Sequence, residues 1–287
     1  MRDFIIVTDS ATDLTKEMAE SLGLHTVQLS VIMEGADPVP NDCVEPKNFY
    51  ADLRAKKSAT TSAVNIDRFL EVFGTLLEKD VDLLYLGFSS GLSGTYNAGA
   101  VAMNELAEKY PDRKLYTVDT LCASMGQGLL VYYATRLKAQ GKTIDEVRDF
   151  VENNKLKLCH WFTVDDLFFL KRGGRVSAAS AVVGTMLGIK PVLHVDDAGK
   201  LINVAKVRGR KAAIDALFEK MKASVLPEEN EAIFISHGDC AEDANYLAQR
   251  IRTELGYTHI EINFVGPVIG AHSGPGTLAL FFVGNVR

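Results

Sequence analysis

The sequence predicts a two-domain α/β protein, with a doubly wound parallel sheet in the first domain and an antiparallel hairpin in the second. Short apolar strands alternate with amphipathic helices in the first half, as in parallel sheets covered by helices. After residue 157 the pattern changes to paired alternating runs separated by a turn sequence. The length of 287 residues suits two domains of ordinary size. We therefore expect an N-terminal α/β domain at 1–157 and a C-terminal α/β domain at 158–287.

The first domain is expected to begin with an apolar strand at 4–8 and a helix at 15–22 that Gly23 ends. Strands and helices then alternate, with strands expected at 25–33, 83–88 and 115–118, and helices at 66–77, 95–109 and 123–139. Thr143 and Glu146 have the spacing of a capping box. A helix is therefore expected from there to about residue 154, where the first domain ends.

The second domain is expected to contain a β-hairpin. Residues 191–195 and 201–207 are alternating runs on either side of the turn-forming segment 196–200. The remaining expected elements are strands at 232–236, 260–265 and 278–283, a helix at 211–222, and a helix that the capping pair Asp239 and Glu242 begins and Gly256 ends.

Composition and charge exclude several classes of protein. Hydrophobic residues make up 47% of the chain and charged residues 24%, as in folded globular proteins. Acidic and basic residues are interleaved and the net charge is −6, so nucleic acid is not an expected partner. No apolar segment reaches the roughly 18 residues of a membrane span. The first residues also lack a signal peptide's apolar stretch, so we expect a cytoplasmic protein without stable membrane insertion.

Cysteines and carboxylates do not predict a metal site. The four cysteines, at positions 43, 122, 159 and 240, are far apart and form no Cys-x-x-Cys pair. They are expected to be buried, reduced thiols. Turn and capping roles account for Asp9 and Asp13 better than metal binding does. No cofactor is therefore expected.

The segment between the predicted strand 83–88 and the following helix has the features of an anion site. It reads Ser-Ser-Gly-Leu-Ser-Gly-Thr over residues 89–95. A helix N-terminus has unpaired amides and a partial positive charge, so Ser93, Thr95 and the Gly94 amide are suited to hold an anion. The alternative is that Ser93 or Thr95 only caps the helix.

Two further segments bring polar side chains to domain edges. Thr61 and Ser62 precede a helix that Asn65 is expected to cap. Residues 266–276 contain four glycines and two prolines around His272, and they predict an irregular loop that positions this side chain. The alternative is a purely structural histidine.

A basic segment precedes an uncharged one. Lys171 and Arg172 lie shortly before residues 177–189, which contain no charged side chain. This apolar stretch predicts either ordinary core or the lining of a tunnel for an alkyl chain.

These motifs together resemble the DegV family. The resemblance rests on residues 8–14, 61–62, 89–95, 119–120, 170–175, 190–191 and 270–276, which recur in the family's order. It covers nearly the whole chain. It implies two α/β domains that enclose one long-chain fatty acid between them. In many bacteria such proteins are the non-catalytic lipid-binding subunits of fatty acid kinase, whose catalytic subunit phosphorylates the bound carboxylate.

The resemblance also implies which residues contact the ligand. It puts the carboxylate against the Thr61 and Ser93 hydroxyls, with the Gly94 amide and His272 nearby. Ser62 and Thr95 complete the expected ligand-binding set. The family usually has a proline where this chain has Val64, and this departure affects the expected role of Ser62 more than that of Thr61.

Two groups of cations are candidates for docking the kinase. Residues 206–211 contain Lys206, Arg208, Arg210 and Lys211 in an otherwise acidic protein, and such a patch can orient an acidic partner. Lys171 and Arg172 are expected near the mouth of the pocket, where they can neutralise a phosphate. The alternative is that all are ordinary solvated charges.

A serine hydrolase is the main alternative function. Ser93, His272 and either Asp9 or Asp119 could form a triad acting on a lipid or ester. The segment around Ser93 is not the Gly-x-Ser-x-Gly elbow, however, which argues against it. A nucleotide enzyme is disfavoured too, because Arg136 occupies the position of the first glycine that a phosphate loop ending at Gly141-Lys142-Thr143 requires.

Overall fold

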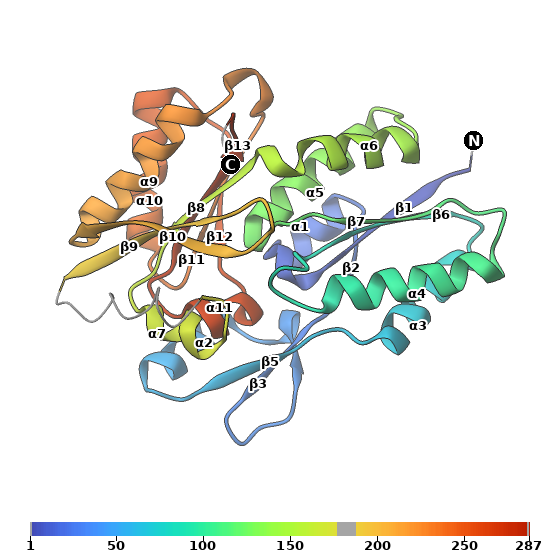
Figure 1. Cartoon of the computed structure of the whole chain (residues 1–287), viewed down its shortest axis with the longest axis horizontal. Helices are drawn as coiled ribbons and strands as arrows, with labels where there is room; N and C mark the ends of the chain where they lie inside the picture. The colour runs from blue at the N-terminus through green and yellow to red at the C-terminus, as the bar shows by residue number, and fades with distance from the viewer. Residues whose placement is uncertain (1, 177–187, 286) are drawn as a thin grey trace.

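The computed structural model describes residues 2–176, 188–285 and 287 of the chain (Figure 1). The strands form a four-stranded, a six-stranded and a three-stranded sheet. The predicted fold class is confirmed, because the first half contains a parallel sheet and the second a largely antiparallel one. Within the described ranges, no helix combines the length and apolar character needed to cross a membrane.

The first sheet has the strand order β2-β1-β6-β7, and all its pairings are parallel. Its strands are β1 (Phe4–Asp9), β2 (His25–Val27), β6 (Asp82–Gly87) and β7 (Leu115–Asp119). Every residue of β6 is buried, because helices cover both faces of the sheet. The helices α3 (Ile66–Leu77) and α4 (Thr95–Lys109) share one apolar cluster with Leu83, whereas α5 (Ser124–Ala139) and α6 (Ile144–Asn154) share another with Leu84. This domain is therefore doubly wound.

Local sequence fixes two of these helix ends as predicted. The side chain of Asn65 accepts a hydrogen bond from the Arg68 amide at 2.9 Å and caps α3. Thr143 and Glu146 form the predicted capping box of α6, in which each side chain accepts from the other residue's amide.

The second sheet has the order β10-β9-β8-β13-β11-β12. Its strands are β8 (Leu158–Thr163), β9 (Ile189–Val195), β10 (Leu201–Arg208), β11 (Ile233–His237), β12 (Ile260–Phe264) and β13 (Leu278–Val283). Among the described pairings of this second sheet, only that of β11 with β12 is parallel. The predicted hairpin is β9 and β10, with an irregularity between Asn203 and Ala205.

Apolar packing continues across the predicted domain boundary. One face of the second sheet packs against α9 (Arg210–Ser224) and α10 (Ala241–Leu255). The other face lies toward α5 (Figure 1), and Phe162, Phe234 and Phe281 share a cluster with α5. The boundary at residue 157 stays a prediction, but the two halves do not have fully separate cores.

The predicted strand at 25–33 is wrong as a single strand. It consists of β2 in the first sheet and β3 (Ser30–Met33) in the three-stranded sheet, which also contains β4 (Val39–Pro40) and β5 (Ala59–Ser62). The chain leaves the first sheet after Val27, because the Leu29 amide donates to the Ser10 hydroxyl at 3.0 Å instead of to a neighbouring strand. Thr61 and Ser62 are consequently on β5.

The predicted irregular loop around His272 is also wrong. Residues Pro267–Ser273 form helix α11, with proline at its first position and Gly274 after its end at φ 80°. The side chain of Asn41 accepts from the Val268 amide at 2.9 Å and caps this helix from a distant part of the chain. His272 therefore lies in the last helical turn.

The predicted capping pair of α10 is wrong as well. The helix begins at Ala241, and Cys240 occupies the N-cap position without a side-chain cap. Asp239 instead forms an ion pair with Arg54. The expected helix at 15–22 is α1 (Lys16–Ser21). Several other short elements were not predicted, namely α2 (Pro46–Arg54), α7 (Leu167–Arg172) and the 3-10 turns Ser10–Thr12, Asn41–Cys43, Lys155–Lys157 and Pro227–Glu229.

Candidate ligand-binding site

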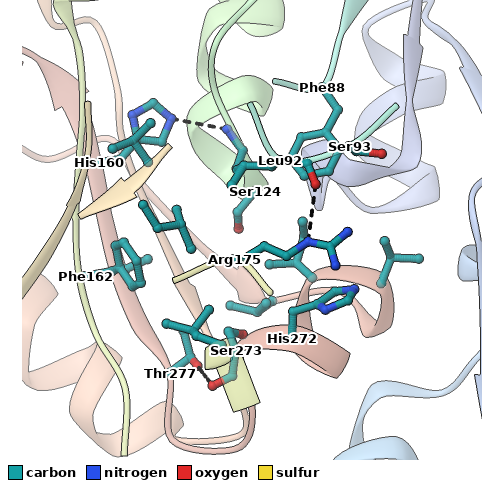
Figure 2. A pocket seen from close by; sticks show the side chains of 18 of the residues that line it. Phe88, Leu92, Ser93, Ser124, His160, Phe162, Arg175, His272, Ser273 and Thr277 are labelled. Atoms are coloured by element: carbon teal, nitrogen blue, oxygen red, sulfur yellow. Dashed lines mark hydrogen bonds between the residues drawn. The ribbon is translucent and has the colours of Figure 1, made fainter. Parts of the chain in front are cut away.

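A cavity of about 240 Å³ lies between the two halves of the molecule (Figure 2). Both halves contribute to its wall, and most of the wall is apolar. The apolar side chains include Leu29, Phe88, Leu92, Phe162, Val195, Leu201, Val265, Val268, Ile269 and Phe281. Such a cavity is suited to an elongated apolar ligand.

Ser93 and Gly94 reach the cavity from the turn after β6. The carbonyl of Ser89 accepts from the amides of Leu92 and Ser93 at 3.0 and 3.1 Å, which closes the turn just before α4. The Ser93 hydroxyl accepts from the Thr95 amide at 3.2 Å and lies 2.9 Å from the Thr95 hydroxyl. Ser93 therefore accepts from the first amide of α4, although Gly94 occupies the N-cap position, and it also lines the cavity. Thr95 is fully buried behind it and does not line the cavity.

Thr61 and His272 meet at the cavity from β5 and α11. The Thr61 hydroxyl lies 2.8 Å from Nε2 of His272, although the two residues are 211 positions apart in the sequence. Burial, followed by the charges of Arg175 and Arg172, lowers the pKa of His272 to about 4. The imidazole is therefore neutral at physiological pH. Ser62 is exposed, its hydroxyl donates to the Ala63 carbonyl at 3.3 Å, and it does not line the cavity.

Arg175 also lines the cavity, although it was not among the expected ligand-binding residues. Figure 2 shows its guanidinium between Leu92 and His272, with Nε donating to the Leu92 carbonyl at 3.2 Å. The Gly173 carbonyl accepts from Nη1. Among the described residues no carboxylate pairs with Arg175. Arginine stays protonated even where burial lowers its pKa, so a half-buried positive charge faces the cavity.

Gly173 allows the chain after α7 to approach His272 closely. A Cβ atom at position 173 would lie 2.3 Å from Nδ1 of His272, so a side chain there would displace the imidazole. Gly173 is therefore the sequence signal for close packing at this point, whereas an added Cβ at Gly174 would have no atom within 4 Å. Recognising what packs there requires the three-dimensional structure.

A second group of polar side chains also lines the cavity, and Figure 2 shows three of them, Ser124, His160 and Thr277. With Ser236 they form a group in which every member is buried. Ser124 donates to the carboxylate of Asp13, and its oxygen lies 2.9 Å from that of Ser236. Nε2 of His160 accepts from the Ala123 amide at 3.3 Å. Protein groups thus occupy the hydrogen-bonding capacity of this inner group.

The structure does not assemble the hydrolase triad. Asp9 accepts from the Phe88 amide at 2.8 Å and the Tyr85 hydroxyl at 2.9 Å, so it supports the strand ends. Asp119 accepts from the amides of Ser90 and Leu121. In the described part of the chain, neither Ser93 nor any carboxylate hydrogen-bonds to His272. The same ranges contain no cluster of three or more His, Cys, Asp or Glu side chains that could hold a metal ion.

The predicted docking cations differ in whether they form ion pairs within the protein. Lys171 and Arg172 end α7, and the Arg172 guanidinium lies 5.1 Å from the centre of the Phe169 ring. Lys206 and Arg208 are exposed on β10 and form no ion pair with another described residue. Arg210 is instead paired with Asp243 at 2.8 Å and with Asp165 at 3.6 Å. The free charge of this patch is therefore on Lys206 and Arg208.

Of the predicted apolar tunnel segment 177–189, residues 177–187 lie outside the described residues. On its N-terminal side, Leu170 lines the cavity and Val176 is buried. The choice between ordinary core and tunnel lining therefore stays a prediction.

Comparison with known proteins gives a consistent result over the whole chain. Residues 3–285 match the family described as uncharacterised protein, DegV family. A DegV domain-containing protein from Clostridium perfringens is 47% identical, with 100% of this chain and 99% of that protein aligned.

Solved structures agree with this assignment. A fatty acid-binding DegV-family protein from Thermus thermophilus is 30% identical, with a TM-score of 0.86 over 98% of this chain and 99% of that one. A fatty acid-binding protein from Thermotoga maritima is 31% identical, with a TM-score of 0.81 and the same coverage. The chain belongs to the DegV family.

Proposed function

We propose that this protein binds one long-chain fatty acid in the cavity, with the carboxylate at the end formed by Thr61, Ser93, Gly94, Arg175 and His272. One observation carries the proposal: polar groups from four separate segments converge at one end of a largely apolar cavity. The fatty acid-binding relatives support the choice of ligand. We call these five residues the headgroup site.

Two kinds of interaction stabilise such a complex. Each buried methylene contributes about 0.8 kcal/mol, so the alkyl chain supplies most of the binding free energy. The hydroxyls and the amide donate to the carboxylate, and the Arg175 guanidinium adds a charge-assisted interaction. A neutral His272 can donate one hydrogen bond without adding a second charge.

We further propose that the bound acid is presented to the catalytic subunit of a fatty acid kinase. In that reaction a carboxylate oxygen attacks the terminal phosphorus of ATP, ADP leaves, and an acyl phosphate forms. The product carries more negative charge than the acid. The guanidinium of Arg175 is placed to offset that charge, with Lys171 and Arg172 close by in sequence at the end of α7. The DegV resemblance supports this step.

Lipid content tests the binding proposal directly. The purified protein is expected to carry about one fatty acid per chain, measured by native mass spectrometry and by denaturing extraction. The double variant Thr61→Ala/Ser93→Ala is expected to carry less, because each lost hydrogen bond to a charged group costs about 1.5–3 kcal/mol. A protein that carries no lipid and takes up no added palmitate contradicts the proposal. Covalent labelling of Ser93 by a fluorophosphonate would favour the hydrolase alternative instead.

A further inference from the structure

The turn that carries Ser93 is held by the opposite half of the molecule. Ser89, at the start of this turn, is fully buried, and its hydroxyl donates to the Gly199 carbonyl at 2.8 Å. Gly199 lies in the turn between β9 and β10, 110 positions later in the sequence. The tip of the β9–β10 hairpin is therefore in direct contact with the turn after β6.

This contact leaves no space for side chains. A Cβ atom at Gly91 would lie 2.6 Å from the Ala198 carbonyl oxygen, and one at Gly199 would lie 2.1 Å from the Ser89 hydroxyl. Gly199 also has φ +70°, a conformation that glycine adopts readily. The hairpin tip and the turn consequently meet backbone against backbone, and small changes at either side must move the other.

Ser89 transmits this contact to the headgroup site. Its hydroxyl also accepts from the Gly91 amide at 3.2 Å, and its carbonyl accepts from the amides of Leu92 and Ser93. One residue thus joins the hairpin tip to the backbone that orients the Ser93 hydroxyl. Ser89 itself does not line the cavity.

We propose that Ser89 is a positioning residue, which fixes Ser93 and Gly94 at the carboxylate by binding the hairpin tip. A hairpin in the second half of the chain then determines how tightly a turn in the first half binds the carboxylate. This inference rests on the proposed fatty acid binding and deepens it. Its distinctive consequence is a loss of affinity for the acid headgroup without a loss of affinity for the alkyl chain.

The test uses two variants that remove the contact from opposite sides, each with a matched control. Ser89→Ala removes the hydroxyl, and its control is Ser90→Ala, an exposed serine in the same turn. Gly199→Ala introduces the clash, and its control is Gly209→Ala, which has φ +93° but no atom within 4 Å of the added Cβ. Delipidated proteins are titrated with myristate and with 1-tetradecanol, which has the same chain length and no charge.

Ser89→Ala and Gly199→Ala are expected to bind myristate about tenfold more weakly and to bind tetradecanol within about twofold of the wild type. Both controls should match the wild type for both ligands. Equal losses for acid and alcohol, or no loss for either, overturn the inference. If Ser89→Ala does not fold, the Gly199→Ala and Gly209→Ala pair decides in the same way. A wild-type protein that fails to bind myristate overturns the proposed function as well, whereas normal wild-type binding beside unchanged variants overturns this inference alone.

Discussion

The headgroup site and the inner polar group line the same cavity but differ in how their hydrogen bonds are used. Ser124 and His160 in the inner group are at most 6% exposed, and both bond to other protein groups. Thr61, Ser93 and Arg175 are only partly buried and lie where the two halves meet. We therefore expect the inner group to contribute mainly to stability and the headgroup site mainly to binding.

The largest expected effect is the loss of the cation. Arg175→Met removes the charge but keeps an apolar chain, so fatty acid affinity should fall by about 1.5–3 kcal/mol, the usual value of a hydrogen bond to a charged group. Unfolding free energy should change much less, because Arg175 bonds only to carbonyls among the described residues. Calorimetric titration with palmitate measures the first quantity, and Arg68→Met on the surface of α3 is the control. Unchanged affinity would remove Arg175 from the headgroup site.

The converse effect is expected in the inner group. Ser124→Ala leaves the buried Asp13 carboxylate without its hydroxyl donor, which should lower the unfolding free energy by about 1–3 kcal/mol. The ratio of myristate to tetradecanol affinity should stay as in the wild type. Urea unfolding and ligand titration on the same preparation give both numbers. A change in the ratio without a change in stability would reverse the assigned roles.

The stability contribution of Asp13, which bonds to Ser124 of the inner group, should depend on pH. Burial raises its pKa from 3.8 to about 7, so the folded state binds this proton more tightly than the unfolded state. The resulting stabilisation is fully present below about pH 4 and is lost as the pH rises through about 7. Wild type should therefore lose stability relative to Asp13→Asn across that window. A stability difference that is independent of pH would show that Asp13 titrates normally.

The smallest expected effect concerns the exposed cations of β10. Lys206→Glu/Arg208→Glu should leave fatty acid binding unchanged and slow acyl phosphate formation a few-fold with a cognate kinase at low salt, because rim charges mainly affect association. The defect should shrink at high salt. Arg210 is left intact, since its ion pair with Asp243 is part of the fold. Equal rates for the variant and the wild type at low ionic strength would exclude this docking surface.

Periodicity predicted most strands and helices, because their core-facing residues recur within each element. It failed where the determining contact is distant in sequence. Helix α11 contains one glycine and one proline and is flanked by further glycines, a composition that suggests a loop, but Asn41, far away in the chain, caps it. The predicted strand at 25–33 divides between two sheets because the Ser10 hydroxyl accepts a hydrogen bond from the Leu29 amide.

The site was predictable to a similar extent. Thr61, Ser93, Gly94 and His272 were expected together, and the structure places all four at one cavity. The DegV resemblance brought these four residues together, whereas helix-start chemistry by itself indicated only Ser93 and Gly94, and loop composition only His272. Arg175 was missed because its importance comes from burial without a carboxylate partner, a property that its neighbours in sequence do not encode. Ser62 and Thr95 have suitable chemistry, but their side chains are directed elsewhere.

The strand order of the second sheet has a consequence for how the protein is made. Strand β13 lies between β8 and β11, although it is the last of the six in the chain. During synthesis, β8 and β11 therefore emerge from the ribosome without their shared central neighbour, and the apolar surface of α5 that packs against this sheet stays uncovered. Nascent chains that expose such surface are prone to aggregate. This half of the molecule can close only after residues 278–283 have been translated.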